Sequence, residues 1–383
     1  MNEILAHPRL RIAVVTEAFL PQVNGVTNSV LRLLEFCKGQ GHEVLIIAPE
    51  SENAPSNYLG YKIKHVPSIS IKKMIPVGVP QKYLEPLLEG FAPDVIHLAS
   101  PIFLGHYVIR IAKRMRIPTV SVYQTDVAGF ARHYGLTIAH NTLKKWISKI
   151  HQNSDITLAP SKWSCRDLES YGVKNVRLWK RGVDLINFNP SRRDELLRTN
   201  IIGGRKKFII GYVGRLAHEK RLDDLAILDK QEDIQLVIVG SGPAEIKFKK
   251  ALPHALFVGH QSGTELARYM ASFDVFVHTG KHETFCQAIQ EALASGVPVI
   301  APNTGGPVDL VEHGKTGLLI DTADPIQLLD AVATFRTHSS FELMKAAAVQ
   351  SVAHRSWDYI NGQLMNHYVD ASKMVAKDEV MVA

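Results

Sequence analysis

The stretch that decides the fold is VFVHTGKHETFCQAIQEALASGVPVI, which occupies residues 275–300. It opens with an apolar run of strand length, continues as a polar loop, and then spaces its apolar residues as one face of a helix does. Gly296 follows this pattern at the place where helices commonly end, and a second apolar run begins at Val297. A strand, a helix and a strand in this order predict a parallel βαβ unit. The apolar helix face consists of Ala288, Ile289, Ala292 and Leu293.

The same alternation of short apolar runs and helical segments extends through most of the chain. With 383 residues, the chain is longer than one hydrophobic core usually serves. We therefore predict an α/β protein with two facing, doubly wound Rossmann-like domains and a ligand-binding cleft between them. Strands are expected at Ile12–Thr16, Val44–Ala48, Val95–Leu98, Thr119–Tyr123, Ile156–Leu158, Phe208–Val213, Leu236–Val239, Leu256–Val258, Val275–His278 and Val297–Ala301, and a helix at Thr27–Gln40.

The boundary between the domains is expected where the composition changes. We predict a first domain at residues 1–184 and a second at residues 205–355. Between them, Asp184–Lys207 contains asparagines, glycines, a proline and a basic run. That composition predicts a linker.

The overall composition excludes several classes of protein. Hydrophobic residues make up 46% and charged residues 21% of the chain, unlike disordered, collagen-like or coiled-coil sequences. The apolar runs are too short to span a membrane, and residues 1–10 are too polar for a signal peptide. Three widely spaced cysteines, Cys37, Cys165 and Cys286, suit a reducing compartment. We therefore expect a cytoplasmic protein, whose net charge of +7 permits an anionic partner without identifying one.

Two loops that follow predicted strands carry residues suited to phosphate. Gly25 lies in the run PQVNGVTNS, where backbone N–H groups and the start of the next helix could hold a phosphate. An ordinary capped turn explains that loop equally well. Arg215 and Lys220 follow the strand Phe208–Val213 and could neutralise a departing diphosphate. The alternative is a solvated basic loop.

A third glycine loop, Gly240-Ser241-Gly242-Pro243, is similar to a dinucleotide-binding turn. However, Glu245 occupies the third glycine position and Pro243 lies inside the turn. We therefore expect a tight strand-to-helix turn and no nicotinamide site.

The richest cluster of polar residues surrounds the predicted helix of the opening stretch. Glu283, Gln287 and Glu291 are spaced by four residues, so they lie on neighbouring helix faces. Two carboxylates there could bind sugar hydroxyls, and the N–H groups of Phe285 and Cys286 could bind phosphate. The alternative is a surface helix with two solvated glutamates.

A metal site and a cysteine nucleophile are both less favoured. His278 and His282 are four residues apart, but Gly280 lies between them in a strand-to-loop segment, not on a helix face. Cys286 lacks an evident histidine–asparagine partner set. We expect no metal and no cofactor other than a substrate.

Glu283 and Glu291 enclose seven residues, and this spacing resembles the E-x7-E motif of the retaining glycosyltransferases of family 4. Those enzymes have the GT-B fold, in which two Rossmann-like domains face one another. The resemblance covers nearly the whole chain. It includes Gly305-Gly306-Pro307. The runs Glu17–Ser29, Tyr123-Gln124-Thr125-Asp126 and His282–Ala301 are similar in detail to bacterial GDP-mannose-dependent α-mannosyltransferases that extend cell-envelope glycolipids.

The resemblance implies roles for individual residues. Arg215, Lys220 and Gly25 would bind the donor diphosphate, and Glu283 would contact the transferred sugar. The remaining donor contacts would come from Phe285, Cys286 and Gln287 to sugar and phosphate, Glu291 to the ribose, and Val258 and Gly259 to the base. A last helix, at residues 357–375, would pack back on the first domain.

One departure from the family affects the sugar site. Many relatives place a histidine at the position of Gln124, close to the sugar. Here we expect Asp126 to meet the donor sugar or the acceptor hydroxyl. No carboxylate is evidently placed as a covalent nucleophile, so front-face attack, with the leaving phosphate accepting the proton, best explains retention.

Other functions share this architecture. A transferase that uses a UDP-hexose and a soluble acceptor is the main alternative. A phosphorylase would need a lysine-bound pyridoxal phosphate, for which no clear site exists, and a non-hydrolysing epimerase is a further rival. A catalytically silent sugar- or membrane-binding module would have no reason to keep Arg215, Lys220, Glu283 and Glu291 together.

Two stretches predict contact with an anionic membrane and hence a lipid acceptor at the cytoplasmic face. Tyr61–Leu84 contains five lysines with interleaved apolar residues and no acidic residue. The stretch from Val127 to Ser154 repeats this asymmetry and adds Trp146, which we expect to be exposed. Lysines near an anionic surface each contribute about 1 kcal/mol. A soluble acidic acceptor is the alternative, and nucleic acid is disfavoured because few aromatics accompany the lysines.

Overall fold

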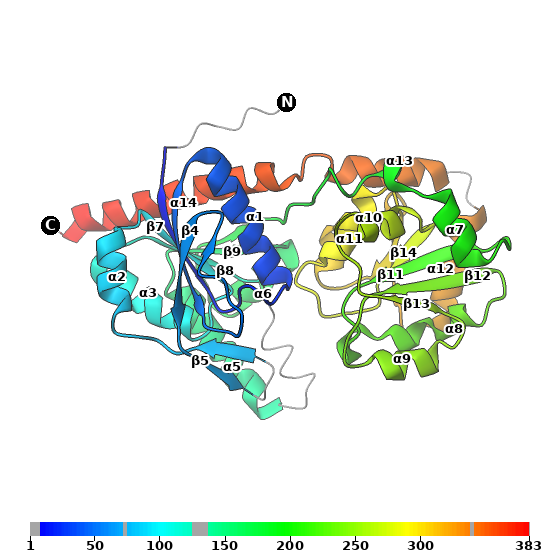
Figure 1. Cartoon of the computed structure of the whole chain (residues 1–383), viewed down its shortest axis with the longest axis horizontal. Helices are drawn as coiled ribbons and strands as arrows, with labels where there is room; N and C mark the ends of the chain where they lie inside the picture. The colour runs from blue at the N-terminus through cyan, green and yellow to red at the C-terminus, as the bar shows by residue number, and fades with distance from the viewer. Residues whose placement is uncertain (1–7, 72–74, 125–136, 338–340, 383) are drawn as a thin grey trace. The chain divides into compact units, whose positions relative to one another are not determined.

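The computed structural model describes residues 8–71, 75–124, 137–337 and 341–382. Its contacts divide the chain into two compact units (Figure 1). The first contains the residues up to Gly182 together with the chain from Trp357 onward, and the second is Val183–Ser356. Each unit has its own parallel sheet with a hydrophobic core on each face.

The sheet of the first unit has eight strands. They are β1 (Arg11–Thr16), β2 (Glu43–Pro49), β3 (Asn57–Tyr58), β4 (Tyr61–Val66), β7 (Val95–Ala99), β8 (Thr119–Val122), β9 (Ile156–Ala159) and β10 (Val176–Leu178). Their order is β10-β9-β8-β7-β1-β2-β4-β3, and only β3 runs antiparallel to its neighbour among the described strands of this sheet. A separate antiparallel pair comprises β5 (Ser68–Ile71) and β6 (Ile75–Gly78).

Both faces of this sheet are buried, because successive strand residues point to opposite sides. Ile12 and Val14 enter one core, and Ala13 and Val15 enter the other. A strand buried on both faces needs apolar residues at successive positions, which explains the continuous apolar runs in the sequence. The first core is closed by α1 (Gly25–Gln40) and α14 (Trp357–Val382), and the second by α2 (Leu84–Phe91), α3 (Leu104–Met115), α5 (Thr137–Gln152) and α6 (Lys162–Ser170).

The helix α14 belongs to the first unit through polar as well as apolar contacts. The indole N–H of Trp179 donates to the carbonyl of Ile360 at 3.0 Å. The Tyr368 hydroxyl lies 2.9 Å from Nδ1 of His97 on β7, and both side chains are buried. Burial lowers the pKa of His97 to about 3, so this imidazole is neutral at physiological pH. A neutral pair can be buried here without an uncompensated charge.

The second unit repeats the doubly wound plan with six parallel strands. They are β11 (Phe208–Val213), β12 (Ile234–Val239), β13 (Leu256–Gly259), β14 (Val275–Val277), β15 (Val299–Pro302) and β16 (Gly317–Ile320), in the order β13-β12-β11-β14-β15-β16. One face is covered by α7 (Glu195–Ile202), α10 (Gly263–Ala271), α11 (Gln287–Ala294) and α13 (Phe341–Val352), and the other by α8 (Ala226–Asp229), α9 (Glu245–Ala251) and α12 (Pro325–Thr337). Short 3-10 helices are η1 (Pro190–Arg192), η2 (His218–Lys220), η3 (Leu222–Leu225) and η4 (Gly306–Asp309).

The prediction that Asp184–Lys207 is a linker is wrong. This segment forms η1 and α7 and belongs to the second unit, which begins at Val183. Asp194 caps α7 by accepting from the Leu197 N–H at 2.9 Å, and Leu197 and Ile201 are buried in the core. The asparagine, proline and glycine residues thus mark the caps of short helices, which use the same residue types as a flexible linker.

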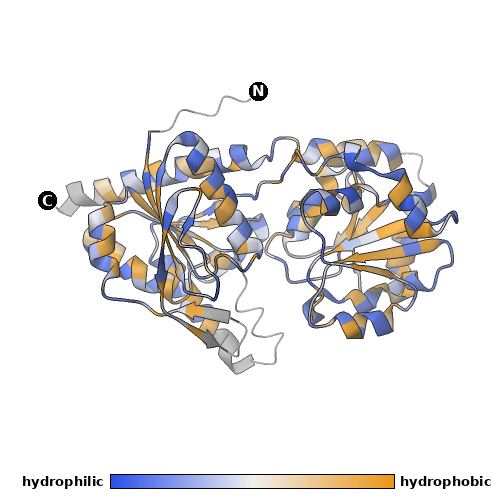
Figure 2. Ribbon diagram, in the orientation of Figure 1, coloured by the Kyte–Doolittle hydropathy of each residue, from blue (hydrophilic) through white to orange (hydrophobic). Residues whose placement is uncertain are grey.

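The distribution of hydropathy agrees with two separately packed units. Within each unit most strands are hydrophobic and the outward faces of the helices are hydrophilic (Figure 2). In the described parts of the chain, no helix combines the length and the apolar character that crossing a membrane requires.

Candidate active site

Three loops at the carboxyl edge of the second sheet surround the predicted residues Arg215, Glu283, Phe285 and Cys286. They follow β11, β14 and β15, which are neighbours in the sheet. Ligands of open α/β sheets bind at this edge. The loops are residues 214–217, 278–286 and 303–305, and the first leads into η2, which ends at Lys220.

Glycines bring the loop after β11 into close contact with the loop after β12. A Cβ on Gly240 would lie 2.0 Å from the carbonyl oxygen of Gly214, and one on Gly242 would lie 2.4 Å from that of Leu216. The Leu216 N–H donates to the Ser241 carbonyl at 2.9 Å. The glycines at 240 and 242 therefore serve backbone packing, as expected for a tight turn, and they support the loop that carries Arg215.

The loop after β15 supports Glu283 in the same way. The Gly306 N–H donates to the Glu283 carbonyl at 2.7 Å. A Cβ on Gly305 would lie 2.9 Å from that carbonyl oxygen, and one on Gly306 would lie 2.5 Å from Cα of Phe285. This close packing fixes the backbone on both sides of Glu283.

Glu283 lies at the centre of a compact polar cluster. Its Oε1 atom accepts from the ammonium of Lys220 and lies 3.3 Å from Nε2 of His278. The side chains of Lys220 and Glu283 are 21% and 18% exposed, so the pair is largely removed from water but still accessible. The Thr279 hydroxyl donates to the Lys220 carbonyl at 2.5 Å and joins the two loops.

The charges of this cluster stabilise one another. Burial alone would raise the pKa of Glu283, but the charge of Lys220 and the hydrogen bond from His278 lower it to about 2. Burial alone would lower the pKa of His278, but the neighbouring Cys286 and Glu283 raise it to about 9. Burial opposes the charge of Lys220 as well, yet Glu283 raises its pKa. At neutral pH Glu283 is therefore a carboxylate, and Lys220 and His278 are cations.

Tyr212 and His278 are two residues that sequence reasoning did not include in the sugar site. The two rings stack with centroids 6.3 Å apart and planes 9° from parallel, and Tyr212 is fully buried. The Tyr212 hydroxyl donates to the Arg215 carbonyl at 3.3 Å. Tyr212 thus connects the cluster around Glu283 to the loop of Arg215, which no sequence motif indicated.

One group of side chains has the composition of a metal site. Ligand-type atoms of His278, Glu283 and Cys286 all lie within 4.8 Å of one another, and zinc accepts this set of ligands. However, the ammonium of Lys220 already neutralises Glu283 and would repel a cation. His282, the second histidine of the sequence hypothesis, is exposed and is not part of the group.

The helix α11 begins with a residue in an uncommon conformation. Cys286 has φ 82° at the N-cap position and makes no side-chain capping bond. Phe285 and Cys286 are buried, at 4% and 9% exposure, whereas Gln287 and Glu291 are half-buried. The side chain of Cys286 therefore does not cap α11, whose first turn follows Glu283 closely in the chain, and helix N-termini favour phosphate.

The remaining predicted residues of the second unit are Arg215, Val258 and Gly259. Arg215 is 47% exposed and its Nη2 donates to Glu219 at 2.7 Å. Val258 and Gly259 end β13, which β12 and β11 separate from β14. The Val258 carbonyl accepts from the Gln261 side chain at 3.1 Å.

The first unit contributes Gly25, at the start of α1. The helix begins at Gly25, slightly earlier than expected, and Asn24 caps it by accepting from the Val26 and Thr27 N–H groups at 2.9 and 3.0 Å. Two N–H groups that the sequence hypothesis offered to a phosphate are therefore already used. A Cβ on Gly25 would meet no atom of the described residues within 4 Å, so their packing does not require a glycine here.

Two further sequence predictions concern the first unit. Asp126 lies outside the described residues. Trp146 is half-buried, not exposed as expected, because its indole N–H donates to the Ile102 carbonyl at 3.3 Å and its ring packs on His106 at 4.6 Å.

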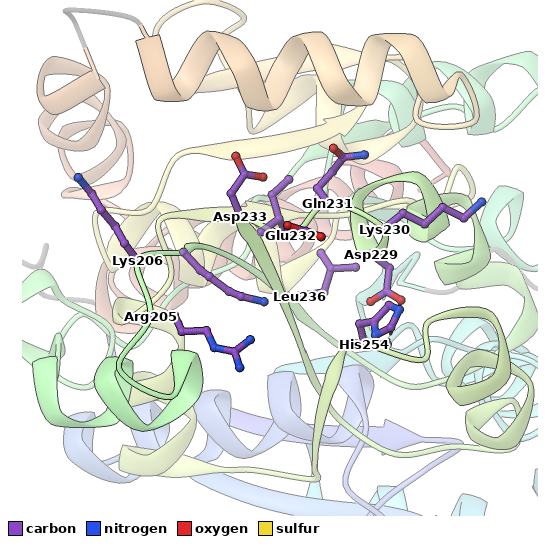
Figure 3. A pocket seen from close by; sticks show the side chains of 11 residues that line it. Arg205, Lys206, Asp229, Lys230, Gln231, Glu232, Asp233, Leu236 and His254 are labelled. Carbon is purple, nitrogen blue, oxygen red and sulfur yellow. Dashed lines mark hydrogen bonds between the residues drawn. The ribbon is translucent and has the colours of Figure 1, made fainter.

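A pocket of about 730 Å³ lies elsewhere in the second unit (Figure 3). Arg205 and Lys206 line one side, and Asp229 and His254 line the other. These residues precede β11, β12 and β13, so the pocket is at the amino edge of the sheet. It is therefore distinct from the cluster of Glu283 at the carboxyl edge.

Comparisons with known proteins agree with the fold. Residues 23–186 match the model of "Glycosyltransferase Family 4" and residues 195–348 that of "Glycosyl transferases group 1". Among solved structures, sucrose-phosphate synthase from Thermosynechococcus elongatus has a TM-score of 0.76 at 19% identity, over 94% of this chain and 99% of that one. The protein is a glycosyltransferase with the GT-B fold, as predicted.

Two curated relatives place the chain more closely. It is 45% identical to a GDP-mannose-dependent alpha-mannosyltransferase of Corynebacterium glutamicum, over 94% of this chain and 89% of that protein. It is 25% identical to the phosphatidyl-myo-inositol mannosyltransferase of Mycobacterium leprae, over 97% of this chain and 100% of that protein. The chain belongs to the family 4 glycosyltransferases.

Proposed function

We propose that the protein transfers mannose from GDP-mannose, with retention at the anomeric carbon, to a glycolipid acceptor. The observation that carries this proposal is the carboxyl group of Glu283 held between Lys220 and His278 at the carboxyl edge of the sheet. The names of the relatives support the donor, because a close match over 94% of the chain extends through both units. The second relative supports a lipid acceptor.

The charges of the cluster suit a donor with a diphosphate leaving group. Lys220 and Arg215 are cations that stabilise the charge developing on the phosphate as the sugar leaves. The uncapped start of α11, with Phe285, Cys286 and Gln287, offers further donors to phosphate and sugar. Because its pKa is low, Glu283 acts as a hydrogen-bond acceptor for sugar hydroxyls and not as a proton donor.

The other assignments follow the family resemblance. Gly25 meets the diphosphate from the first unit, Glu291 binds the ribose, and Val258 and Gly259 meet the base. Asp126 is proposed to contact the donor sugar or the acceptor hydroxyl. The departing phosphate takes the acceptor proton, so the protein supplies charge and positioning and needs no metal.

A thermal-shift panel with GDP, UDP and ADP and their sugars tests the donor. A ligand that binds the native state raises the melting temperature by mass action. We expect GDP and GDP-mannose to give the largest shifts. A larger shift with UDP or ADP would contradict the proposed donor.

We also propose that the first unit docks on an anionic membrane. Lys62, Lys64 and Lys82 are exposed, and Ile69 nearby in the chain is 63% exposed. Each such lysine contributes about 1 kcal/mol at an anionic surface, and apolar side chains that enter the interface add to this. Lys145 and Lys149 on α5 are exposed as well, whereas Lys72 and Lys73 lie outside the described residues.

Sedimentation with anionic and zwitterionic vesicles, at low and high salt, tests the docking. We expect binding to anionic vesicles only, weakened by salt. Reversing Lys62, Lys64 and Lys82 to glutamate should abolish it, while reversing the exposed Lys206, Lys230 and Lys250 of the second unit should not. Equal binding to both vesicle types, or none, would indicate a soluble acceptor.

A further inference from the structure

Arg181 is a buried cation at the carboxyl edge of the first sheet, in the turn that follows β10. It is 7% exposed. Its Nη2 atom donates to the carbonyl of Gly25 at 2.6 Å, and its Nη1 atom donates to Oε1 of Gln124 at 2.7 Å. One guanidinium thus binds both Gly25, which is assigned to the donor diphosphate, and Gln124, the position that lies close to the sugar in many relatives.

The two acceptors come from loops after different strands. Gly25 follows β1 and Gln124 follows β8, and β7 lies between these strands in the sheet. A guanidinium is planar and directs its N–H groups along fixed lines, so it sets the separation of two acceptors. A lysine ammonium in its place would keep the charge but not this geometry.

Trp357, the first residue of α14, packs against Arg181 and its neighbour Gly182. Its guanidinium carbon lies 5.8 Å from the ring centroid of Trp357. A Cβ on Gly182 would lie 2.6 Å from Cα of Trp357, so only glycine allows this close approach. The arginine is therefore supported on one side by packing and directed to the two loops on the other.

We propose that Arg181 is a positioning residue for sugar transfer. It holds Gly25, which would meet the diphosphate, at a set distance from Gln124, the position close to the sugar in the family. The inference rests on the proposed function, because this spacing matters for catalysis only if a nucleotide sugar binds there. Arg181 acts through the two loops and need not touch the donor.

The variant Arg181→Lys tests the inference. A misplacement of about 1 Å in a catalytic site costs about 10²-fold in rate, and we expect a fall in kcat of that order. GDP affinity should stay within about twofold, since most of the proposed nucleotide contacts are in the second unit. Backbone amides at residues 24–28 should exchange hydrogen faster, because their loop has lost its anchor.

The matched control is Arg177→Lys. Arg177 on β10 pairs with Asp370 of α14 at 2.6 Å, so it anchors the same helix from the same region. For Arg177→Lys we expect kcat and the hydrogen exchange of the amides at residues 24–28 to stay near those of the unmodified protein. In a Gln124→Ala background, Arg181→Lys should cost less than it does alone, because two residues that act together are not additive.

Unchanged kcat and unchanged exchange in Arg181→Lys would overturn the inference. An equal loss in Arg177→Lys would also overturn it, because the effect would then arise from docking of α14. If the unmodified protein is inactive with GDP-mannose, the proposed donor is wrong. The exchange comparison needs no ligand and still decides whether Arg181 holds the two loops.

Discussion

The loop after β14 in the second sheet and the loop between β1 and α1 in the first sheet differ in chemistry. Each lies at a carboxyl edge and leads into a helix. The loop after β14 gathers Glu283, Lys220 and His278 into a charged cluster, and α11 begins without a side-chain cap. The loop before α1 is neutral at Gly25, and Asn24 caps the helix.

This difference indicates a division of work between the two units. A helix start whose N–H groups are already bound to Asn24 has fewer donors left for a ligand. The start of α11 has no side-chain cap and follows Glu283 and His278, whose pKa values are shifted. This combination is typical of a functional site. We infer that the second unit supplies the charge for the reaction and that the first unit supplies shape and positioning.

The largest effect is expected for Glu283→Gln, which should abolish transfer. Its carboxylate is assigned to the sugar, and an amide cannot accept from several hydroxyls and the Lys220 ammonium in the same way. GDP affinity should stay nearly intact, because Lys220 remains free to bind phosphate. Calorimetry with GDP and a transfer assay measure the two quantities. Glu265→Gln, an exposed carboxylate on α10, is the control. A parallel loss of GDP affinity would refute the assignment.

Lys220→Ala and Arg215→Ala should each lose about 2–4 kcal/mol of transition-state stabilisation, as charge-stabilising donors do. Their effects on folding should differ. Lys220→Ala leaves the Glu283 carboxylate without its ammonium partner, which costs about 1–3 kcal/mol of unfolding free energy. Arg215 is 47% exposed, so its loss should cost less than about 0.5 kcal/mol. Kinetics and urea unfolding test both; near-normal turnover in either variant would place the diphosphate elsewhere.

The charged cluster should make stability depend on pH at both ends of the range. The pKa of His278 is raised to about 9 in the folded protein. Protonated His278 therefore stabilises the fold fully below pH 6.5, the ordinary pKa of histidine, and this stabilisation is lost as the pH rises through 9. The lowered pKa of Glu283, about 2, gives stability that is lost as pH falls from about 4.5 toward 2.

In His278→Gln, the decline in unfolding free energy between pH 6.5 and 9 should shrink by roughly 2–3 kcal/mol. Urea unfolding across that range measures it, with the exposed His282→Gln as control. An identical pH profile in His278→Gln and the unmodified protein would show that His278 is not charged in the folded state.

The smallest effect is expected in the first unit, for Gly25→Ala. Among the described residues the new methyl group would meet no atom within 4 Å, so folding should be unchanged or stabilised by about 0.4–1 kcal/mol. If the diphosphate approaches this backbone, the methyl group obstructs it, and a tenfold rise in KM for the donor corresponds to about 1.4 kcal/mol. An unchanged KM would remove Gly25 from the donor site.

The fold could be predicted from the sequence because parallel strands buried on both faces form continuous apolar runs. Phe208–Val213 is a strand with the predicted bounds, since both of its faces are apolar. The helix from Gly25 to Gln40 ends at Gly41 with φ 75°, as its glycine indicated. The helix at residues 195–202 was missed because its caps have the composition of a linker.

The site could be predicted only in part. The E-x7-E spacing pointed to Glu283, but the partner Lys220 is 63 residues away in the chain, and only the sheet order brings them together. The cap on α1 had a visible signal, since asparagine before a helix commonly caps it. Arg181 and Tyr212 had none, because their roles depend on contacts with loops distant in sequence.

The stereochemistry of the product tests the central claim most directly. The unmodified protein is incubated with GDP-mannose and a glycolipid acceptor, and the anomeric proton of the transferred sugar is followed by NMR. We predict an α-linked mannose from the α-linked donor, formed without added metal. A β-linked product would contradict a retaining transfer centred on Glu283, Lys220 and the leaving phosphate.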